Sequence, residues 1–470
     1  MKRKTIPEEK SGAKMPQRVF GSFRDPAGFV FEYDGQIYRQ INHAGKNDFE
    51  KFTASGLFER LTKSGDLIAH REVDIPPAES ALTWKTIQPE RIGFISYPYE
   101  WCFSQLKDAA LLTLRLQKKA LAYGMTLKDA SAYNVQFHRG KPVFIDTLSF
   151  AAYQEGVPWV AYGQFCRHFL APLLLMHYCD VRLAELLPRY LDGIPLDLVS
   201  ALLPRTTYLR FSVLSHIHLH AKAQKTAAQS AAPVKKYSVS KHAQTALLEN
   251  LENLIRALRW NPQGTEWADY TDFNNYNEES LAHKKELVAD FLTATNPASV
   301  WDAGANTGVF SRLASARGIA TIASDIDPAA VEKNYQRCVA EGETQLLPLL
   351  TDLANPAPAL GWQNRERAAF SDRLRVDMGF ALALIHHLAI THHLPFRQIA
   401  GFFANICRAL VIEFVPRGDS QLTRMLSTRV DIFTEYTQEN FEAAFAEFFT
   451  VQQIVPVRGS SRTMYLMVRR

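Results

Sequence analysis

Glycines and carboxylates gather at one predicted strand-to-helix turn in the second half of the chain. The run SVWDAGANTGVF carries Asp302, Gly304, Asn306 and Gly308, and a second apolar run ends at Asp325, 23 residues after Asp302. Glycines allow the backbone to bend tightly there or to lie against a ligand. An acid about 20 residues beyond such a turn commonly binds a ribose hydroxyl. The spacing therefore predicts a nucleotide site.

The residue types at this turn distinguish between nucleotides. A dinucleotide places its pyrophosphate against the turn and needs glycine at the position that Asn306 occupies. Asp302 would repel that phosphate but would attract a ligand that carries an ammonium group, as S-adenosylmethionine (SAM) does. The sequence therefore favours SAM as the cofactor. Asp327, directly before Pro328, is interpreted as the N-cap of the next helix and not as a second ligand.

These residues resemble motif I of the class I SAM-dependent methyltransferases, and the resemblance covers about 265–470. The runs DAGANTGVFSRLA, LALIHHLAI and IEFVP are more narrowly similar to the methyltransferase family that includes the nodulation protein NoeA. The resemblance implies a SAM site in which the third strand ends beside the adenine. The implied SAM-binding residues are Asp302, Gly304, Asn306, Gly308, Asp325, Ile326, Asp352 and Leu353.

The acceptor side is predicted at the ends of the fourth and fifth strands. The fourth strand, FALALI, is expected to end at His386 and His387, and the resemblance implies that this position lies next to the donor methyl. A histidine there could take a proton from a hydroxyl or an amine. We expect His386 to contact the acceptor, with His387 as the alternate; the other interpretation is a histidine without a catalytic role. Glu413 either binds the acceptor or caps local backbone.

The histidine spacings do not predict a metal site. His386 and His393 are seven residues apart, whereas helical metal pairs are commonly four apart, and no carboxylate joins them. His216, His218 and His220 alternate as on one face of a strand, but no fourth ligand is nearby. We therefore expect no metal at these positions.

A second group of candidate residues lies in the first half of the chain. The segment LKDASAYNVQFHRGKPVFIDTLSF contains Asp129, Asn134 and Asp146. Phosphoryl transfer needs a carboxylate to orient a hydroxyl, and an Asn and an Asp to hold Mg²⁺. The spacing resembles the kinase-like fold, including aminoglycoside phosphotransferases, which implies ATP and Mg²⁺ as ligands. The alternative is that the three are turn residues beside a hairpin formed by FHRGKPVFI.

Several departures from the kinase pattern argue against an active kinase. Leu127-Lys128 stands before Asp129 in place of His-Arg, and Thr-Leu follows Asp146 in place of Phe-Gly. No glycine-rich phosphate loop is apparent, and Arg39 stands where the third-strand lysine is expected. Arginine is a poor substitute for a lysine that acts as a point charge on phosphates.

The pattern of elements predicts how these residues are positioned. From residue 299 onward, β-rich runs alternate with helical stretches, which indicates an α/β, Rossmann-like, doubly wound seven-stranded sheet with a final antiparallel pair. We expect a helix from about Thr307 to Gly318 after the glycine-rich turn. The first half predicts an α+β domain: strands in FVFEYDGQIYRQI and WKTIQPERIGFISY around one helix, Asn47 to Ser64, and then mostly helix.

Composition divides the chain into three regions. We predict a kinase-like domain at 1–205, a helical or flexible Lys/Ala-rich connector at 206–264 and a methyltransferase domain at 265–470. The net charge is 53 − 48 = +5, and residues 221–241 hold five lysines and no acid, so the rest of the chain sums to zero. We interpret this connector as a solvated linker and not as a nucleic-acid contact.

Composition also indicates the cellular compartment in which the protein is expected. The five cysteines are scattered and form no CxxC pair, which argues against disulfides and a zinc site. The basic N-terminus leads into no apolar segment, and the longest apolar runs fall short of the roughly 20 residues that span a bilayer. We therefore expect a cytoplasmic protein that has no membrane partner.

Three functions are compatible with the sequence. The first is a SAM-dependent methyltransferase for a small-molecule or glycan-like hydroxyl or amine, with the first half recognising the acceptor. A base amine is disfavoured because no D/N-P-P-Y/F run ends the fourth strand, and nucleic acid is not expected as a partner. The second is a bifunctional enzyme with an ATP/Mg²⁺-dependent kinase-like domain, and the third is a protein that keeps SAM as a structural ligand. Trp267, Tyr270 and Tyr276 either line the pocket or belong to the core.

Overall fold

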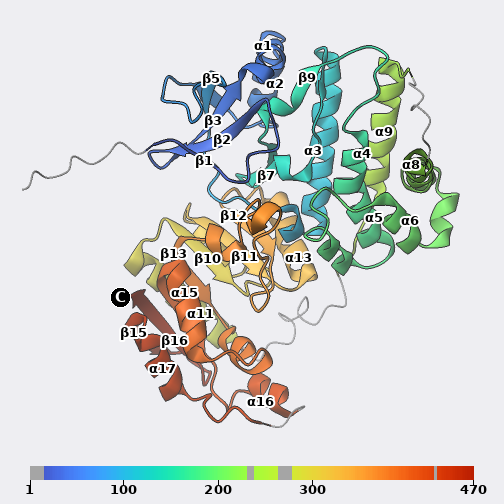
Figure 1. The fold of residues 1–470 in the computed structure, drawn as a ribbon. Coiled ribbons are helices and arrows are strands. Elements are labelled where there is room, and N and C mark those ends of the chain that lie inside the picture. Colours follow the sequence, from blue (N-terminus) through green and yellow to red (C-terminus); the bar gives the residue numbers. More distant parts are fainter. Residues whose placement is uncertain (1–14, 230–237, 263–277, 428–430) are drawn as a thin grey trace, which may run out of the picture.

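The two halves of the chain form two packed parts of different architecture (Figure 1). The computed structural model describes residues 15–229, 238–262, 278–427 and 431–470. Trp267, Tyr270, Tyr276, the predicted boundary at residues 264 and 265, and the connector lysines Lys235 and Lys236 lie outside these described residues. The division into three regions therefore stays a prediction.

The second half is built on one seven-stranded sheet. Its strands are β10 (Ser299–Ala303), β11 (Ala320–Asp325), β12 (Leu346–Leu350), β13 (Val376–Ala381), β14 (Cys407–Phe414), β15 (Phe449–Pro456) and β16 (Thr463–Arg469). They lie in the order β12-β11-β10-β13-β14-β16-β15. The first five are parallel, and β16 runs antiparallel to β14 and β15. The predicted Rossmann-like sheet with a final antiparallel pair is confirmed, and this is a methyltransferase fold.

Helices cover both faces of this sheet because alternate strand residues are apolar on both sides. Val300, Met378 and Val411 pack in one core with α11 (Glu278–Thr295) and α12 (Ser311–Ser315). Trp301 and Leu410 belong to the core of the opposite face. The helices that contribute to that core are α13 (Pro328–Glu341), α14 (Phe370–Arg373), α15 (Phe396–Ile406), α16 (Ser420–Ser427) and α17 (Gln438–Ala446).

Two predicted boundaries in this half are wrong. The helix after the glycine-rich turn is only α12, because Asn306 and Gly308 both adopt positive φ and keep the backbone out of the helical region until Ser311. The fourth strand is β13 and not FALALI. β13 pairs with β10 from Val300–Met378 to Ala303–Ala381, so both strands end at the same level.

The first half begins with a small antiparallel sheet. Its strands, in spatial order, are β1 (Gln17–Arg18), β2 (Gly28–Tyr33), β3 (Gln36–Asn42), β5 (Thr83–Pro89) and β4 (His70–Glu72). The single helix predicted from Asn47 to Ser64 is wrong: Gly56, with φ of +77°, separates α1 (Lys46–Ala54) from α2 (Leu57–Lys63). The predicted strand at 84–97 ends at Pro89, because its partner β4 begins there, at the pair His70–Pro89.

A helical lobe follows the sheet. Its long helices are α3 (Phe103–Ala122), α5 (Ala171–Tyr178), α8 (His220–Gln229) and α9 (Lys241–Ala257), and its short strands are β6 (Met125–Leu127), β7 (Val135–His138), β8 (Lys141–Phe144) and β9 (Phe150–Ala152). The strands β7 and β8 form the predicted hairpin. α9, from the predicted connector, packs against α3. A small sheet lobe before a helical lobe is the order that the kinase-like resemblance implies.

The strand face predicted for His216, His218 and His220 is wrong, because these residues lie in helix. They belong to the π-helical turn Leu214–Leu219 and to the start of α8. The reason is the spacing of the apolar residues: Val213, Ile217 and Ala221 are four apart and all buried, which is a helical and not a strand pattern.

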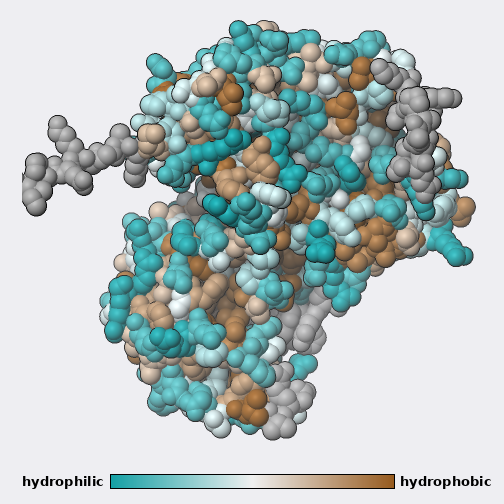
Figure 2. Space-filling view, in the orientation of Figure 1, coloured by the Kyte–Doolittle hydropathy of each residue, from teal (hydrophilic) through white to brown (hydrophobic). Residues whose placement is uncertain are grey.

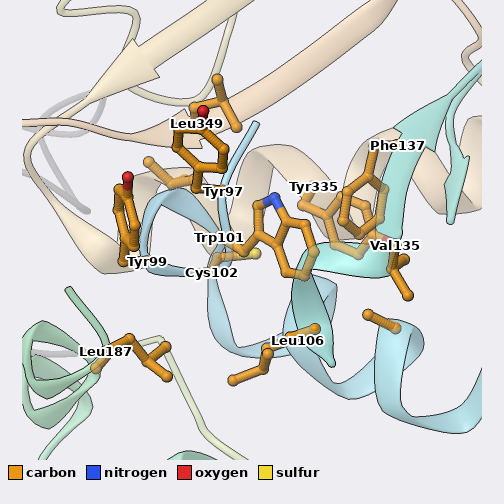
Figure 3. Packing of buried hydrophobic residues seen from close by; sticks show 14 of the residues in the cluster. Tyr97, Tyr99, Trp101, Cys102, Leu106, Val135, Phe137, Leu187, Tyr335 and Leu349 are labelled. Carbon is orange, nitrogen blue, oxygen red and sulfur yellow. The ribbon is translucent and has the colours of Figure 1, made fainter. Parts of the chain in front are cut away.

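The apolar cores of the two halves are continuous. Figure 3 shows Trp101 and Phe137 of the first half beside Tyr335 of α13. The ring centroids of Phe137 and Tyr335 lie 5.7 Å apart, and Tyr97 belongs to the same buried cluster as Leu349 of β12. The two halves are therefore one packed body. None of the helices in the described parts of the chain has the length and apolar character that a membrane-spanning helix requires.

Candidate functional site

The glycine-rich turn lies across the carboxyl ends of β10 and β11. The backbone N–H groups of Gly304 and Ala305 both donate to the carbonyl of Ser324, at 2.9 and 3.0 Å. Gly304, Asn306 and Gly308 have φ of +71°, +49° and +78°. Three left-handed residues in five make the turn tight, and its backbone is thereby placed at the edge of the sheet where α/β folds bind ligands.

Glycine is required at position 308 for a second reason. A Cβ atom built there would lie 2.7 Å from the side-chain amide of Asn334 and 2.8 Å from the guanidinium of Arg312. Arg312 donates to the carbonyl of Thr307 at 2.7 Å and forms an ion pair with Glu343 at 2.9 Å. The turn is therefore held between α12 and the end of α13, and a side chain at position 308 would displace Asn334 or Arg312.

Asp325, the last residue of β11, holds the turn by hydrogen bonds to its backbone. Its carboxylate accepts hydrogen bonds from the N–H groups of Asn306, at 2.7 Å, and Asp327, at 2.9 Å. Burial raises the pKa of Asp325 to about 6, against the effect of these donors. An ionised carboxylate has about four acceptor positions. Backbone N–H groups use part of this capacity, with that of Ile326 adding to those of Asn306 and Asp327, and the remaining capacity suits a ligand hydroxyl such as those of ribose.

Asp302 lies in the middle of the sheet, directly before the turn. Its carboxylate accepts a hydrogen bond from the Ser311 hydroxyl of α12 at 2.6 Å. Burial raises the pKa of Asp302 to about 6, while the positive charge of Lys284 acts in the opposite direction. The residue is 2% exposed. It therefore supplies negative charge beneath the turn, and part of that charge is already balanced by Lys284.

The residues predicted beside the adenine lie at the neighbouring strand ends. Ile326 follows β11 and is 50% exposed, which leaves an apolar surface beside Asp325. Asp352 follows β12 and accepts a hydrogen bond from the N–H of Ala354 at 2.8 Å, and Leu353 is half-buried. The predicted N-cap is confirmed, because Asp327 accepts a hydrogen bond from the N–H of Ala329 at 2.8 Å.

A buried ionic network lies at the ends of β13 and β14. Glu413 is 0% exposed. Its carboxylate accepts hydrogen bonds from the ammonium of Lys284, at 2.6 Å, and from the N–H of Ala383, at 2.7 Å. Arg462 lies 3.7 Å from Glu413 and donates to Asp419 at 2.8 Å. Glu413 therefore anchors the backbone after β13, which is one of the two roles predicted for it.

Neither Lys284 nor Arg462 is among the residues predicted from the sequence. A signal for Lys284 exists: it lies on the buried stripe of α11 with Ser280, Leu287 and Val288, where a lysine is unexpected without a partner. No such signal exists for Arg462, which lies in the short connection between β15 and β16 and meets Asp419 from 43 residues away.

His386 and His387 lie in the helical turn after β13 and not at the end of a strand. The ring centroids of the two histidines are 4.1 Å apart. His386 is 0% exposed, and neither of its ring nitrogens has a hydrogen-bond partner among the described residues. Burial, the second histidine and the cations Arg462 and Lys284 hold the pKa of His386 well below its usual value. Burial lowers the pKa of His387 to about 4. Both rings are therefore neutral at pH 7, so each has one N–H donor and one nitrogen acceptor.

The three kinase-like candidates converge around the β7–β8 hairpin. The Ser149 hydroxyl donates to Asp146 at 2.7 Å and accepts from the Asn134 amide at 3.3 Å. Burial raises the pKa of Asp129, and the negative charge of Asp146 adds to this effect. The three side chains are therefore neighbours in the structure, and their role in phosphoryl transfer stays a prediction.

Arg39 forms an ion pair with Asp146, the acid predicted to bind Mg²⁺ at this second site. Its guanidinium lies 2.5 Å from the Asp146 carboxylate, and the two side chains are only 12% and 14% exposed. The helix carboxylate of Asp48 accepts a hydrogen bond from the N–H of Ala152 at 3.1 Å. The carboxylate expected to bind Mg²⁺ is therefore already neutralised by an arginine. Within the described residues, no group of three or more His, Cys, Asp and Glu side chains is arranged to hold a metal ion.

One loop of the second half connects the two candidate sites. It begins at Asp352 and Leu353 and continues to Glu366, which accepts hydrogen bonds from Arg24 at 2.6 and 3.0 Å. The guanidinium of Arg367 lies 4.3 Å from the centre of the Tyr133 ring, directly before Asn134. The loop that begins at one site thus packs against the other through an ion pair and a cation–π contact.

Comparisons with known proteins give one close relative and several distant folds. No family model matches the chain. The chain is 35% identical to the nodulation protein NoeA of Rhizobium meliloti (strain 1021) over 472 residues, which cover 98% of each chain.

Solved structures match at lower similarity. The N-methyltransferase NodS from Bradyrhizobium japonicum WM9 is 13% identical, with a TM-score of 0.31, over 41% of this chain and 98% of NodS. The bifunctional kinase-methyltransferase WbdD is 14% identical, with a TM-score of 0.31, over 46% of each chain. The chain thus spans about half the length of WbdD.

Proposed function

The chain belongs to the family of the nodulation protein NoeA, and from that premise we propose that it transfers the methyl group of SAM to a hydroxyl or amine acceptor. The observation that carries this proposal is the turn at β10 and β11. There, a tight left-handed backbone and the remaining acceptor capacity of Asp325 meet at the carboxyl edge of a methyltransferase sheet.

SAM would be held along this edge by residues of three strand ends. In the proposal, Asp325 accepts the ribose hydroxyls, and the exposed face of Ile326 with Asp352 and Leu353 contacts the adenine. Asp302 provides negative charge for the ammonium group from beneath the turn. The glycine-rich turn fits the group because Gly304, Asn306 and Gly308 bring backbone to the ligand without large side chains.

When it is bound, SAM supplies an electrophilic methyl group on a positively charged sulfur. The protein must then hold the acceptor atom in line with that methyl and exclude water, which can supply most of the rate enhancement. We assign this positioning to His386, since its two ring nitrogens are buried and have no partner among the described residues. Its low pKa makes it a weak proton acceptor, so in our proposal it orients the acceptor by hydrogen bonds. Glu413 supports this site by anchoring Ala383.

The proposed acceptor is a small-molecule or glycan-like hydroxyl or amine, recognised with help from the first half of the chain. The support is the shared boundary: the loop that begins beside the adenine positions continues to Arg24 and Tyr133 of the first half.

A second candidate function is phosphoryl transfer from Mg²⁺-ATP. The convergence of Asp129, Asn134 and Asp146 favours it, and the Arg39–Asp146 ion pair opposes it. Nucleotide affinity with and without Mg²⁺ tests it in wild type, Asp146→Ala and Arg39→Ala. A Mg²⁺-dependent affinity that Asp146→Ala abolishes would support it. If nucleotide never binds, the domain is a scaffold.

Isothermal titration of the full chain with SAM and with S-adenosylhomocysteine tests the main proposal. We expect Asp325→Ala to weaken binding about 100-fold, because two hydrogen bonds to a charged acceptor are lost. Asp290→Ala, which removes an exposed acid from α11, is the control and should bind normally. The metabolites of cells that express wild type or Asp325→Ala are then compared to find the acceptor. We expect it to appear as a metabolite that becomes heavier by one methyl group with wild type only. Absence of SAM binding by wild type would refute the proposal.

A further inference from the structure

Five large apolar side chains are exposed on a group of short helices at the outer edge of the helical lobe. These elements are α6 (Leu196–Leu202), the 3-10 helix Arg205–Leu209, α7 (Phe211–Val213), the π-helical turn Leu214–Leu219 and α8, and they contact one another. The exposed side chains are Leu202 (43%), Tyr208 (48%), Leu209 (87%), Phe211 (76%) and Leu219 (53%).

This group of helices, which we call the α6–α8 surface (residues 196–226), faces away from the rest of the molecule. Figure 1 shows α6 and α8 on the side of the helical lobe opposite β2 and β3. In Figure 2, hydrophobic residues gather over the part of the lobe where α5 and α6 lie. Contiguous exposed apolar side chains of this size are characteristic of interaction sites.

The same stretch is strongly basic. Between Asp197 and Glu249 the sequence contains no Asp or Glu and seven Lys and Arg residues. Four of these, Arg205, Arg210, Lys222 and Lys225, lie on the α6–α8 surface and are exposed. None of the four forms an ion pair with a described residue. Asp197, at the start of α6, is the acid on these helices.

We propose that the α6–α8 surface docks on an anionic lipid bilayer. Leu209 and Phe211, the two most exposed side chains, flank Arg210. This arrangement suits a membrane interface, where apolar tips enter the boundary between head groups and acyl chains and neighbouring cations pair with anionic lipids. The contact is peripheral, so it needs no spanning segment. It is independent of the methyl-transfer proposal.

The chemistry of the surface favours lipid over other occupants. In a twofold contact with a second copy, the same four cations would meet one another without acids between them, which is unfavourable. A nucleic acid would satisfy the cations but would leave Leu209 and Phe211 in water. A fluid lipid surface accommodates both the charges and the protruding apolar tips without a complementary shape.

Sedimentation of the full chain with lipid vesicles tests the proposal. We expect binding to vesicles of phosphatidylcholine mixed with phosphatidylglycerol and little binding to phosphatidylcholine alone. The variant Arg205→Glu/Arg210→Glu should lower the partition coefficient at least about tenfold, since each basic residue near such a surface contributes about a fivefold preference. The variant Leu209→Ser/Phe211→Ser should lower it by at least the same factor, since two large apolar side chains no longer enter the interface.

Two matched variants control for general changes in surface properties. Ile432→Ser removes an apolar side chain that is 63% exposed elsewhere, and Arg91→Glu reverses an exposed charge outside the α6–α8 surface. Both should bind vesicles as wild type does, and thermal unfolding should show that all four variants are folded. The proposal is overturned if wild type ignores anionic vesicles, or if the controls lose as much binding as the two test variants. It is also overturned if the surface variants instead abolish RNA binding or a dimer.

Discussion

At the scale of single residues, two buried carboxylates serve the same turn in different ways. Asp325 is held by two backbone N–H groups and Asp302 by the Ser311 hydroxyl, and burial raises the pKa of both from 3.8 to about 6. In the ligand-free protein, their ionisation therefore costs stability as the pH rises from about 4 to about 6. A cationic ligand would recover part of that cost.

The raised pKa values predict a pH-dependent affinity for SAM. Below about pH 6 the carboxyl groups of Asp302 and Asp325 are mostly protonated, so they lose their charge and part of their acceptor capacity. We expect the affinity to rise at least about tenfold from about pH 5 to about pH 7, because the ionised fraction of each carboxyl group with a pKa of about 6 rises about tenfold over this range. Titration calorimetry across this range measures it.

The control for this prediction is Asp325→Asn, which keeps the shape of the side chain but cannot ionise. It should bind SAM more weakly at neutral pH and show a flatter profile than wild type. Parallel profiles for the two proteins would contradict the assignment of the pH effect to Asp325.

Residue spacing in the sequence predicted which acids of the turn lie together, but it could not reveal their partners. Asp302 and Asp325 are close because adjacent parallel strands end at one edge, which a sequence pattern indicates. Lys284 and Glu413 meet across 129 residues. No local sequence pattern predicts that contact, so the ionic network can be identified only in the folded structure.

At the scale of elements, the turn and α12 depend on one arginine. Arg312 binds the carbonyl of Thr307 and the carboxylate of Glu343, so the turn is fastened to the end of α13. The sequence predicted the strands of this half well because apolar runs are strong signals. It overestimated α12, because the positive φ of Asn306 is a local conformation that periodicity does not reveal.

Gly308→Ala tests whether this crowded turn forms the cofactor site. A methyl group there would face both the strain of a left-handed backbone, roughly 1–2 kcal/mol, and close contacts with Asn334 and Arg312. We expect SAM affinity to fall at least about tenfold, since displacement of Arg312 releases the turn. Calorimetry measures the affinity, and thermal unfolding measures the stability.

Gly318→Ala is the matched control for this substitution. Gly318 has nearly the same φ, +79°, but a Cβ atom there has nothing within 4 Å. It should lose a similar amount of stability from backbone strain and keep its SAM affinity. Equal losses of affinity in the two variants would show that strain alone, and not the fit of the turn, is responsible.

At the scale of the whole molecule, the boundary between the halves is closely bonded. Glu332 of α13 accepts hydrogen bonds from the N–H of Ser104, at 3.0 Å, and from the Ser104 hydroxyl. Gln105 donates to the carbonyl of Pro348 at 3.0 Å, and Arg373 forms a buried ion pair with Glu100. The separate kinase-like and methyltransferase resemblances each describe one half, so neither could predict this boundary.

Glu332→Ala should destabilise both halves together. It leaves the partly buried N–H of Ser104, at the start of α3, without its acceptor, which costs up to about 1–3 kcal/mol. Chemical denaturation followed by far-UV dichroism and by tryptophan fluorescence measures the change, and both probes should shift to the same lower midpoint.

Glu341→Ala is the control on the same helix. Glu341 pairs with Arg337 on the surface, where both side chains are about half exposed, and such pairs contribute about 0–1 kcal/mol. It should unfold nearly as wild type does. If Glu332→Ala also does so, the boundary bonds contribute nothing to cooperativity.

The apolar contact of Trp101 and Phe137 with Tyr335 has one more consequence. We expect that neither half folds as a free-standing module, because each would expose to water the apolar surface that the other now covers. Either half expressed alone is expected to aggregate through this exposed apolar surface. Recombination that exchanges only one half between relatives must carry the matching face of the other with it.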